Sequence, residues 1–584
     1  MRFVIAIVSF VVAIGMIGYG VAQRTFLAEP SEMVASLSES KDPAVTVIDG
    51  KTLNAFDGSQ TITITSSGPI FAAYGRTDDV AGWIGDTTIN KVSYSSKTGD
   101  LTSKTVTGKS DSVPDPRGSD LWLDEYSHDK RVSLTVKVPA DVSFVIISDG
   151  KKPAPGDISI TWPIDNRTPF SGPLIIGGTV LLLAGLAVLL WALNHQRKTR
   201  GPRRKPPKMP KVPRQRGMKA VTRAKTKALE VTGGRRATRR GLIAVLPVVL
   251  VSTLALSGCG AFGSASGSTP SPTPSTAQQA GVDVPPPAVT VRQIQRIVAD
   301  VATVAATADA KLDTTLIATR FEGPALQLRL ADYAIRKADG SIAAVPAIPT
   351  GPVEVILPQQ TDSWPRTVFA VVKDDKDKTV APVALFLVQD DPRSQYKVNY
   401  AVTLEPSAKI PPLAPAIVGA ARLDPGVSLF AMAPDGIAAA YGDILLTDKA
   451  STSYEKFDEK NDSLIKAVGL DAKNAIKAGL STTASITYTT AAGAGDTIVL
   501  ATNDSGALVA VNLNETTVVA PVETGAAVNP SGAVKALSAI GVTVKGIQAV
   551  YGDQLLFYVP AASSKAKIVL LGYSQGLVSA TELP

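Results

Sequence analysis

The chain is divided by an apolar run at residues 174–193, which reads LIIGGTVLLLAGLAVLLWAL and carries no charged side chain. A second run at residues 3–22 is flanked by Arg2 and Arg24. A helix of about 20 apolar residues spans the roughly 30 Å hydrocarbon core of a bilayer. Neither run has a polar face that could turn toward water, so we expect two transmembrane helices, at residues 3–22 and 174–194, and not two helices of a soluble core.

The segment at residues 195–240 is strongly basic. It carries eighteen Lys and Arg against one acid, Glu230, although the whole chain of 584 residues has a net charge of only +8. Positively charged loops stay on the cytoplasmic side of a membrane. We therefore expect a cytoplasmic, proline-rich linker at 195–240, with residues 25–172 and 260–584 on the extracytoplasmic side of the plasma membrane. The segment lacks interleaved aromatic residues, so the lipid bilayer is the expected partner and nucleic acid is not.

The only cysteine of the chain, Cys259, ends a third apolar segment at residues 241–259. Small and apolar residues precede it: Leu256, Ser257 and Gly258. A basic flank, an apolar stretch and small residues before one thiol are typical of a lipoprotein signal, here an internal one. We expect processing at this site and a covalent diacylglycerol on Cys259. The alternative is a third membrane span in which Cys259 is apolar filler.

Arg239 and Arg240 stand just before the third apolar segment. They resemble a twin-arginine export signal, but we favour ordinary positive-inside charge as their explanation.

Residues 25–172 alternate between apolar and polar side chains, which predicts half-buried strands separated by turn clusters. We expect an exported all-β, sandwich-like domain with strands at residues 45–48, 61–65, 69–74, 92–94, 132–138, 142–147 and 158–162. Trp83, Trp122 and Trp162 could line a ligand groove, but we interpret them as packing anchors.

Residues 260–287 are mostly Ser, Thr, Pro, Gly and Ala, so a disordered tether is expected. Thr290 and Gln293 then form a capping box for a helix. The patterns that follow predict a helix at 324–337 and strands at 353–357, 367–372, 382–389 and 396–404. The order repeats, with helices at 437–446 and 462–478 and strands at 486–490, 497–502, 508–512, 555–559 and 568–572. Two α+β modules are expected, at 288–430 and 431–584.

This order of helices followed by strands resembles the cone-shaped modules of the nuclear-transport-factor-2-like superfold, over residues 288–584. The layout of the whole chain resembles a family of uncharacterised actinobacterial envelope proteins, some of which carry a loose glycosyltransferase label. The resemblance implies a fold and a location, and it brings no catalytic motif with it.

Two strings suggest chemistry. Residues 572–576 read GYSQG and match the nucleophile elbow of α/β-hydrolases. The two histidines, His128 and His195, both lie far upstream, so we interpret this string as a turn between two strands.

Asp375 and Asp377 have the spacing by which nucleotide-sugar transferases hold a divalent ion. They lie between two apolar segments, so we interpret them as part of a charged hairpin turn, and we interpret Asp390 and Asp391 in the same way.

The sequence thus predicts a multi-domain membrane protein of the cell envelope that binds or scaffolds, with no evident catalytic, cofactor or metal site. Its expected partners are the bilayer and either a cell-wall polymer or another envelope protein. An envelope glycosyltransferase, or an accessory subunit of one, is the alternative.

Overall fold

The computed structural model describes residues 1–28, 30–38, 42–164, 169–199, 284–460 and 462–584. It divides into two compact units, one with residues 1–19 and 173–282 and the other with residues 20–172 and 283–584. The third apolar segment with Cys259, most of the basic linker and most of the expected tether lie outside the described residues.

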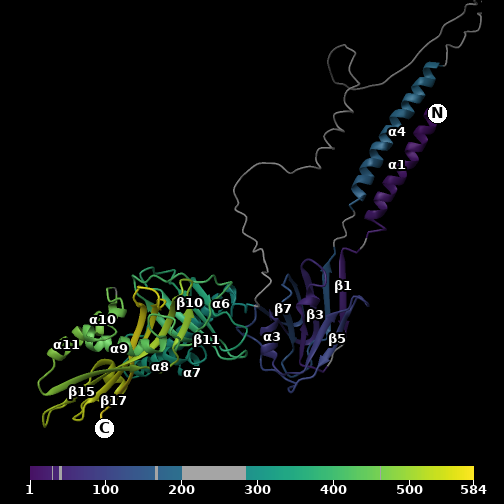
Figure 1. The fold of residues 1–584 in the computed structure, drawn as a ribbon. Helices are drawn as coiled ribbons and strands as arrows, with labels where there is room; N and C mark the ends of the chain where they lie inside the picture. Colours follow the sequence, from purple (N-terminus) through teal and green to yellow (C-terminus); the bar gives the residue numbers. More distant parts are fainter. Residues whose placement is uncertain (29, 39–41, 165–168, 200–283, 461) are drawn as a thin grey trace, which may run out of the picture. The chain divides into compact units, whose positions relative to one another are not determined.

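The first unit contains most of two apolar helices, α1 (Arg2–Arg24) and α4 (Ser171–Thr199). Both are long and apolar enough to cross a membrane, and they lie side by side in Figure 1. α4 continues through the first residues of the expected linker, to Thr199.

Small residues line the contact between these two helices. An added Cβ at Gly178 would lie 2.7 Å from the side chain of Ile17, and one at Gly185 would lie 3.1 Å from that of Ser9. The pairing runs antiparallel, because the partner on α1 moves toward the N-terminus as α4 advances. Small side chains let helix backbones approach closely, so a glycine seam holds this pair together.

The second unit begins with an eight-stranded sheet, which we call the β domain (residues 30–164). Its elements are β1 (Glu32–Ser38), β2 (Val45–Ile48), α2 (Gly50–Leu53), β3 (Gln60–Arg76), α3 (Thr77–Ile84), β4 (Ile89–Tyr94), β5 (Leu101–Val106), β6 (Asp124–Val136), β7 (Val142–Ile147) and β8 (Asp157–Pro163). The strands run in the order β1-β8-β3-β7-β2-β4-β5, and β6 also pairs with β3. All pairs are antiparallel except β2 with β4.

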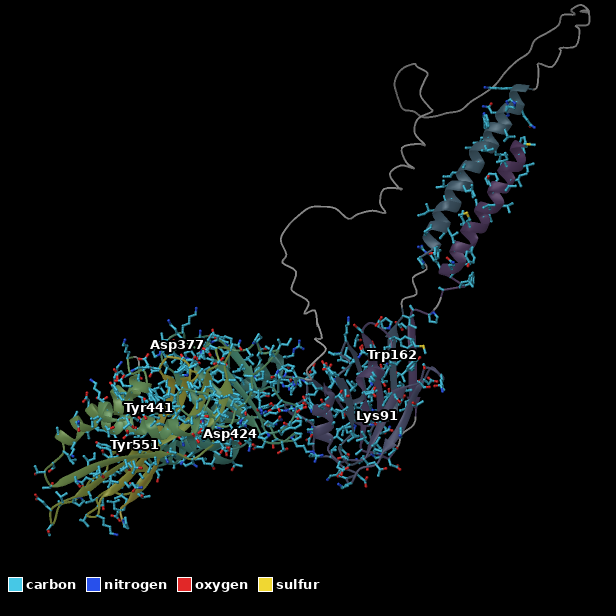
Figure 2. All side chains as sticks on the ribbon, in the orientation of Figure 1. Lys91, Trp162, Asp377, Asp424, Tyr441 and Tyr551 are labelled. Atoms are coloured by element: carbon cyan, nitrogen blue, oxygen red, sulfur yellow. The ribbon has the colours of Figure 1, made fainter. Side chains whose placement is uncertain are left out.

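The three tryptophans of this domain are buried in its two cores, which confirms that they are packing anchors. Trp162 donates its indole N–H to the carbonyl of Leu53 at 2.8 Å, and Trp122 donates to that of Pro116 at 2.7 Å. Figure 2 shows Trp162 among the strands. The buried indole N–H groups of Trp162 and Trp122 therefore each have an acceptor, as a stable core requires.

Residues 284–584 form the C-terminal domain. Its helices are α6 (Val291–Lys311), α7 (Thr314–Ile317), α8 (Gly323–Ala338), α9 (Ile437–Thr447), α10 (Ser463–Val468), α11 (Leu470–Ala478) and α12 (Gly532–Ser538). Its strands are β9 (Val353–Pro358), β10 (Arg366–Val372), β11 (Val383–Gln389), β12 (Lys397–Leu404), β13 (Ala484–Ala492), β14 (Ile498–Ala501), β15 (Ala507–Pro521), β16 (Ile547–Val559) and β17 (Val569–Glu582). The capping box of Thr290 and Gln293 at the start of α6 is confirmed.

Both halves of this domain share one nine-stranded sheet, in which β12 meets β17 through only two residue pairs. Alternate residues face opposite sides of a strand. Val368 and Ala370 of β10 pack under α6 and α8, and Val509 and Val511 of β15 pack under α9. The opposite faces of the strands from both halves meet in a common core that includes Phe369, Phe386, Leu508 and Leu556. The strands β10 and β11 and the first half of β15 are therefore buried on both sides.

The string at residues 572–576 is neither an elbow nor a turn, so our interpretation was wrong. It lies inside β17, where Gly576 pairs with Gly552 of β16. An added Cβ at Gly572 would lie 2.4 Å from the carbonyl oxygen of Thr403, and one at Gly576 would lie 2.4 Å from Leu328. These two positions are glycine because Thr403 and Leu328 approach the strand too closely to leave room for a Cβ atom. No turn of the chain is needed to explain them.

Candidate functional site

A hollow of about 230 Å³ lies between the helices α10 and α11 and the strands β13, β15, β16 and β17. Its apolar lining residues are Ala467, Val468, Ala472, Ile476 and Ile486, and its polar and aromatic ones are Lys473, Tyr488, Glu515, Thr517, Tyr551 and Gln575. We call the buried residues Lys473 and Glu515 its floor, and the exposed Ile476 marks its mouth. Tyr551 is labelled on the C-terminal domain in Figure 2. We call this hollow the helical pocket.

The helices over the pocket are positioned by a cap and a glycine. The carboxylate of Asp462 accepts a hydrogen bond from the amide of Ile465 at 2.9 Å and so starts α10. Gly469 separates α10 from α11, and an added Cβ there would lie 2.3 Å from the carbonyl oxygen of Ile465. Only glycine permits this close junction, which breaks the single helix predicted at 462–478 into two.

A buried ion pair forms the floor. The ammonium of Lys473 on α11 lies 2.6 Å from the carboxylate of Glu515 on β15, and each side chain is only 8% exposed. Lys473 also donates to the carbonyl of Val468, and Gln575 donates to Glu515 at 3.1 Å. Buried charges are tolerated when they are paired and hydrogen-bonded in this way.

A second carboxyl group, Asp553 on β16, is fully buried near this ion pair. Burial raises the pKa of Asp553 well above its usual range, and the negative charge of Glu515 raises it further. Neither of its oxygens has a hydrogen-bond partner within the described part of the chain. The raised pKa favours the protonated form of Asp553, which offers one O–H donor.

The surroundings of the pocket add further polar groups. Tyr441 on α9, labelled in Figure 2, donates its hydroxyl to Asp462 at 2.7 Å. The hydroxyl of Tyr488 is buried and has no partner among the described residues. An apolar mouth over a polar floor can hold a ring-sized molecule with one or two polar groups.

The pocket residues were missed from the sequence, although a signal exists. Glu515 follows Val509, Val511 and Leu513 on the inward face of β15, and Asp553 precedes Leu555 on that of β16. A carboxylate in phase with core residues is the pattern that would have revealed them.

The acidic strings are turns, as predicted. The carboxylate of Asp374 accepts hydrogen bonds from the amides of Lys376 and Asp377 at 2.8 and 3.1 Å, and Asp377 accepts from Thr379. Figure 2 labels Asp377 on the C-terminal domain. Asp391 caps the next turn through the amides of Arg393 and Ser394.

Two larger hollows lie beside these strings and share Pro346, Ala381 and Thr403. One, of about 500 Å³, borders Asp374 and Asp375, and the other, of about 350 Å³, borders Ser574. The hydroxyl of Ser574 accepts a hydrogen bond from the amide of Thr403 at 3.2 Å. Neither of these hollows is lined by a histidine.

The predicted processing residues, Leu256 to Cys259, lie outside the described residues. Within the part that the structure describes, no group of three or more His, Cys, Asp or Glu side chains could hold a metal ion.

No curated protein and no solved structure matches the chain. Residues 285–582 match one protein family along nearly the whole C-terminal domain. The match includes the helical pocket and covers just over half of the chain. The chain therefore belongs to the family described as a domain of unknown function (DUF8094).

Proposed function

We propose that this protein is a membrane-anchored binding or scaffold protein of the cell envelope, and that its C-terminal domain binds a ligand in the helical pocket. The two apolar helices support an anchor, and the strongly basic segment after α4 supports a cytoplasmic loop. In this arrangement residues 25–172 and 260–584 lie outside the plasma membrane, and Cys259 carries a diacylglycerol. The resemblance to actinobacterial envelope proteins and to nuclear-transport-factor-2-like modules favours the same arrangement.

The single observation that carries the binding proposal is the composition of the helical pocket. It is lined by the buried Lys473–Glu515 pair and by Tyr488, whose buried hydroxyl has no partner among the described residues, while Ile476 at its mouth is 57% exposed. A buried polar group without a partner costs stability, so the Tyr488 hydroxyl on the lining of this hollow favours a ligand that supplies the missing partner. A sugar ring of a cell-wall polymer has a suitable size and polarity.

A pocket-filling substitution tests this proposal. Ala472 lines the pocket from α11, whereas Ala475 on the same helix is exposed to solvent. We expect Ala472→Phe to abolish the binding of soluble cell-wall glycan fragments, measured by calorimetry on the full chain in detergent, and Ala475→Phe to leave it intact. Equal binding by both variants would place the ligand elsewhere.

The transferase alternative rests on Asp375 and Asp377. Their neighbour Asp374, like Asp377, already accepts hydrogen bonds within the turn, which favours a structural role. The alternative predicts that the full chain binds Mn²⁺ and that Asp375→Asn with Asp377→Asn abolishes this binding. Titration calorimetry of both proteins decides between the two functions.

A further inference from the structure

The β domain and the C-terminal domain meet in a buried polar interface within the second unit. Asp120 of the β domain accepts hydrogen bonds from both terminal nitrogens of Arg320, at 2.6 and 3.3 Å, and from the amide of Tyr396 at 2.8 Å. Its side chain is only 2% exposed and that of Arg320 is 6% exposed. A buried carboxylate that accepts two hydrogen bonds from one guanidinium group fixes the orientation of that arginine.

A second buried ion pair joins Asp79 on α3 to Arg366 on β10. Arg366 of β10 approaches the carboxylate of Asp79 to 2.7 Å, without a well-directed hydrogen bond at that nitrogen. Burial raises the pKa of Asp79, while the nearby positive charges of Arg366 and Arg76 oppose this rise. Arg366 also stacks on the ring of Trp364 at 3.8 Å.

Trp364 fits against a glycine on the β domain. An added Cβ at Gly82 of α3 would lie only 2.8 Å from the Trp364 ring. The indole cannot easily move, because its N–H donates to Gln389 at 2.9 Å and Arg366 covers its face. Glycine is a poor helix former, so its place in α3 is best explained by the contact with this ring.

The C-terminal domain also donates to backbone carbonyls of the β domain. Arg393 reaches those of Trp83 and Ile84, at 2.8 and 2.9 Å, at the C-terminal end of α3, where the last carbonyls of a helix lack intrahelical donors. The carbonyl of Ile84 also accepts from the hydroxyl of Thr87. Gln293 and Arg296 of α6 reach those of Leu121 and Trp122, at 3.0 and 2.6 Å.

From these contacts we infer that the C-terminal domain is a specific partner for the β domain and stays bound to it when the chain between α4 and α6 is cut. Buried ion pairs add little net stability but impose a large penalty on any partner that leaves one charge unpaired. The interface therefore selects the β domain over other apolar surfaces. The inference does not depend on the ligand of the helical pocket or on processing at Cys259. If processing occurs, this interface keeps the released domain docked on the anchored fragment.

The test is to cut the full chain at a site-specific protease sequence inserted within residues 262–280. Such a cut leaves all three apolar segments on the N-terminal fragment, so detergent micelles cannot hold the C-terminal fragment by a lipid or an apolar tail. After complete cleavage, a tag following Pro584 is captured, and the N-terminal fragment is measured by immunoblot through repeated washes in high salt. We expect retention. Immediate loss from the cut wild-type protein would overturn the inference.

Matched variants test the geometry. Gly82→Leu should weaken association on the order of a hundredfold, because a large side chain displaces Trp364 from the interface. Ala81→Leu, at an exposed position of the same helix, should leave it unchanged. Leucine favours a helix more than glycine does, so α3 itself should not be lost. Arg393→Ala alters the partner domain alone and should weaken association too. Equal retention of all three variants would refute the interface described here.

Discussion

Replacing Lys473 with methionine is the most direct test of the pocket floor. Methionine keeps most of the length and volume of the side chain but removes the ammonium. Glu515 would then stay buried with Gln575 as its remaining side-chain donor. Breaking a buried ion pair from one side costs about 3–5 kcal/mol.

The destabilisation caused by Lys473→Met has an upper limit, because Glu515 in this variant can be protonated and so lose its charge. For a glutamate of ordinary pKa, this protonation costs about 4 kcal/mol at pH 7 and only about 1 kcal/mol at pH 5. We therefore expect Lys473→Met to lower the free energy of unfolding by about 3–4 kcal/mol at pH 7 and by about 1 kcal/mol at pH 5.

The assay is urea unfolding of the full chain in detergent, followed by circular dichroism at both pH values. Lys477→Met, on the exposed side of the same helix, is the control and should change the free energy of unfolding by less than about 0.5 kcal/mol. Adding Glu515→Leu to Lys473→Met should restore most of the loss, since no unpaired charge remains. A loss that is equal at the two pH values would refute the charge-based argument.

Three further predictions concern other parts of the chain. Because the pKa of Asp553 is raised, the unfolded chain loses this proton at about pH 4, before the folded chain does, so the stability of the fold decreases as the pH rises above that value. Asp553→Asn should therefore raise the Tm at pH 7 and leave it nearly unchanged at pH 4. A lower Tm of this variant at pH 7 would contradict the argument. Trp162→Ala should destabilise the β domain by about 3–5 kcal/mol, seen as an early thermal transition, because the indole is fully buried and bonded to Leu53. In an immunoblot of a doubly tagged chain, Cys259→Ala should merge two fragments into one full-length band, and a single band from the wild type would remove the processing proposal.

The elements that the sequence predicted correctly have strong local signals. The continuous apolar runs of β10 and β11, the alternating residues of β12 and the capping box of α6 are signals that tertiary contacts did not override. β15 extends nine residues beyond the predicted end at residue 512, through polar residues that include Asn514 and Thr516. In the structure these residues continue the ladders with β13 and β16.

The pairing of charges in the pocket and in the domain interface was not predictable from local patterns. Lys473 and Glu515 are 42 residues apart, and Asp120 and Arg320 are 200 residues apart. The phase of Glu515 on its strand marks it as facing inward, but its partner is not visible until the fold brings Lys473 to it. The glycines at residues 572 and 576 were misread for the same reason, since the atoms they approach belong to Thr403 and Leu328.

The core shared by the two halves of the C-terminal domain has a consequence for the order of folding. During synthesis the strands β9 to β12 emerge first, and α6 and α8 can cover one of their faces at once. Phe369 and Phe386 on the other face must wait for β14 to β17, more than 100 residues later. The pair Thr403 and Tyr573 closes last and has a high sequence separation, which is typical of slow folding. Until the final strand arrives, the first half exposes an uncovered aromatic face, and surfaces of this kind make nascent intermediates prone to aggregation.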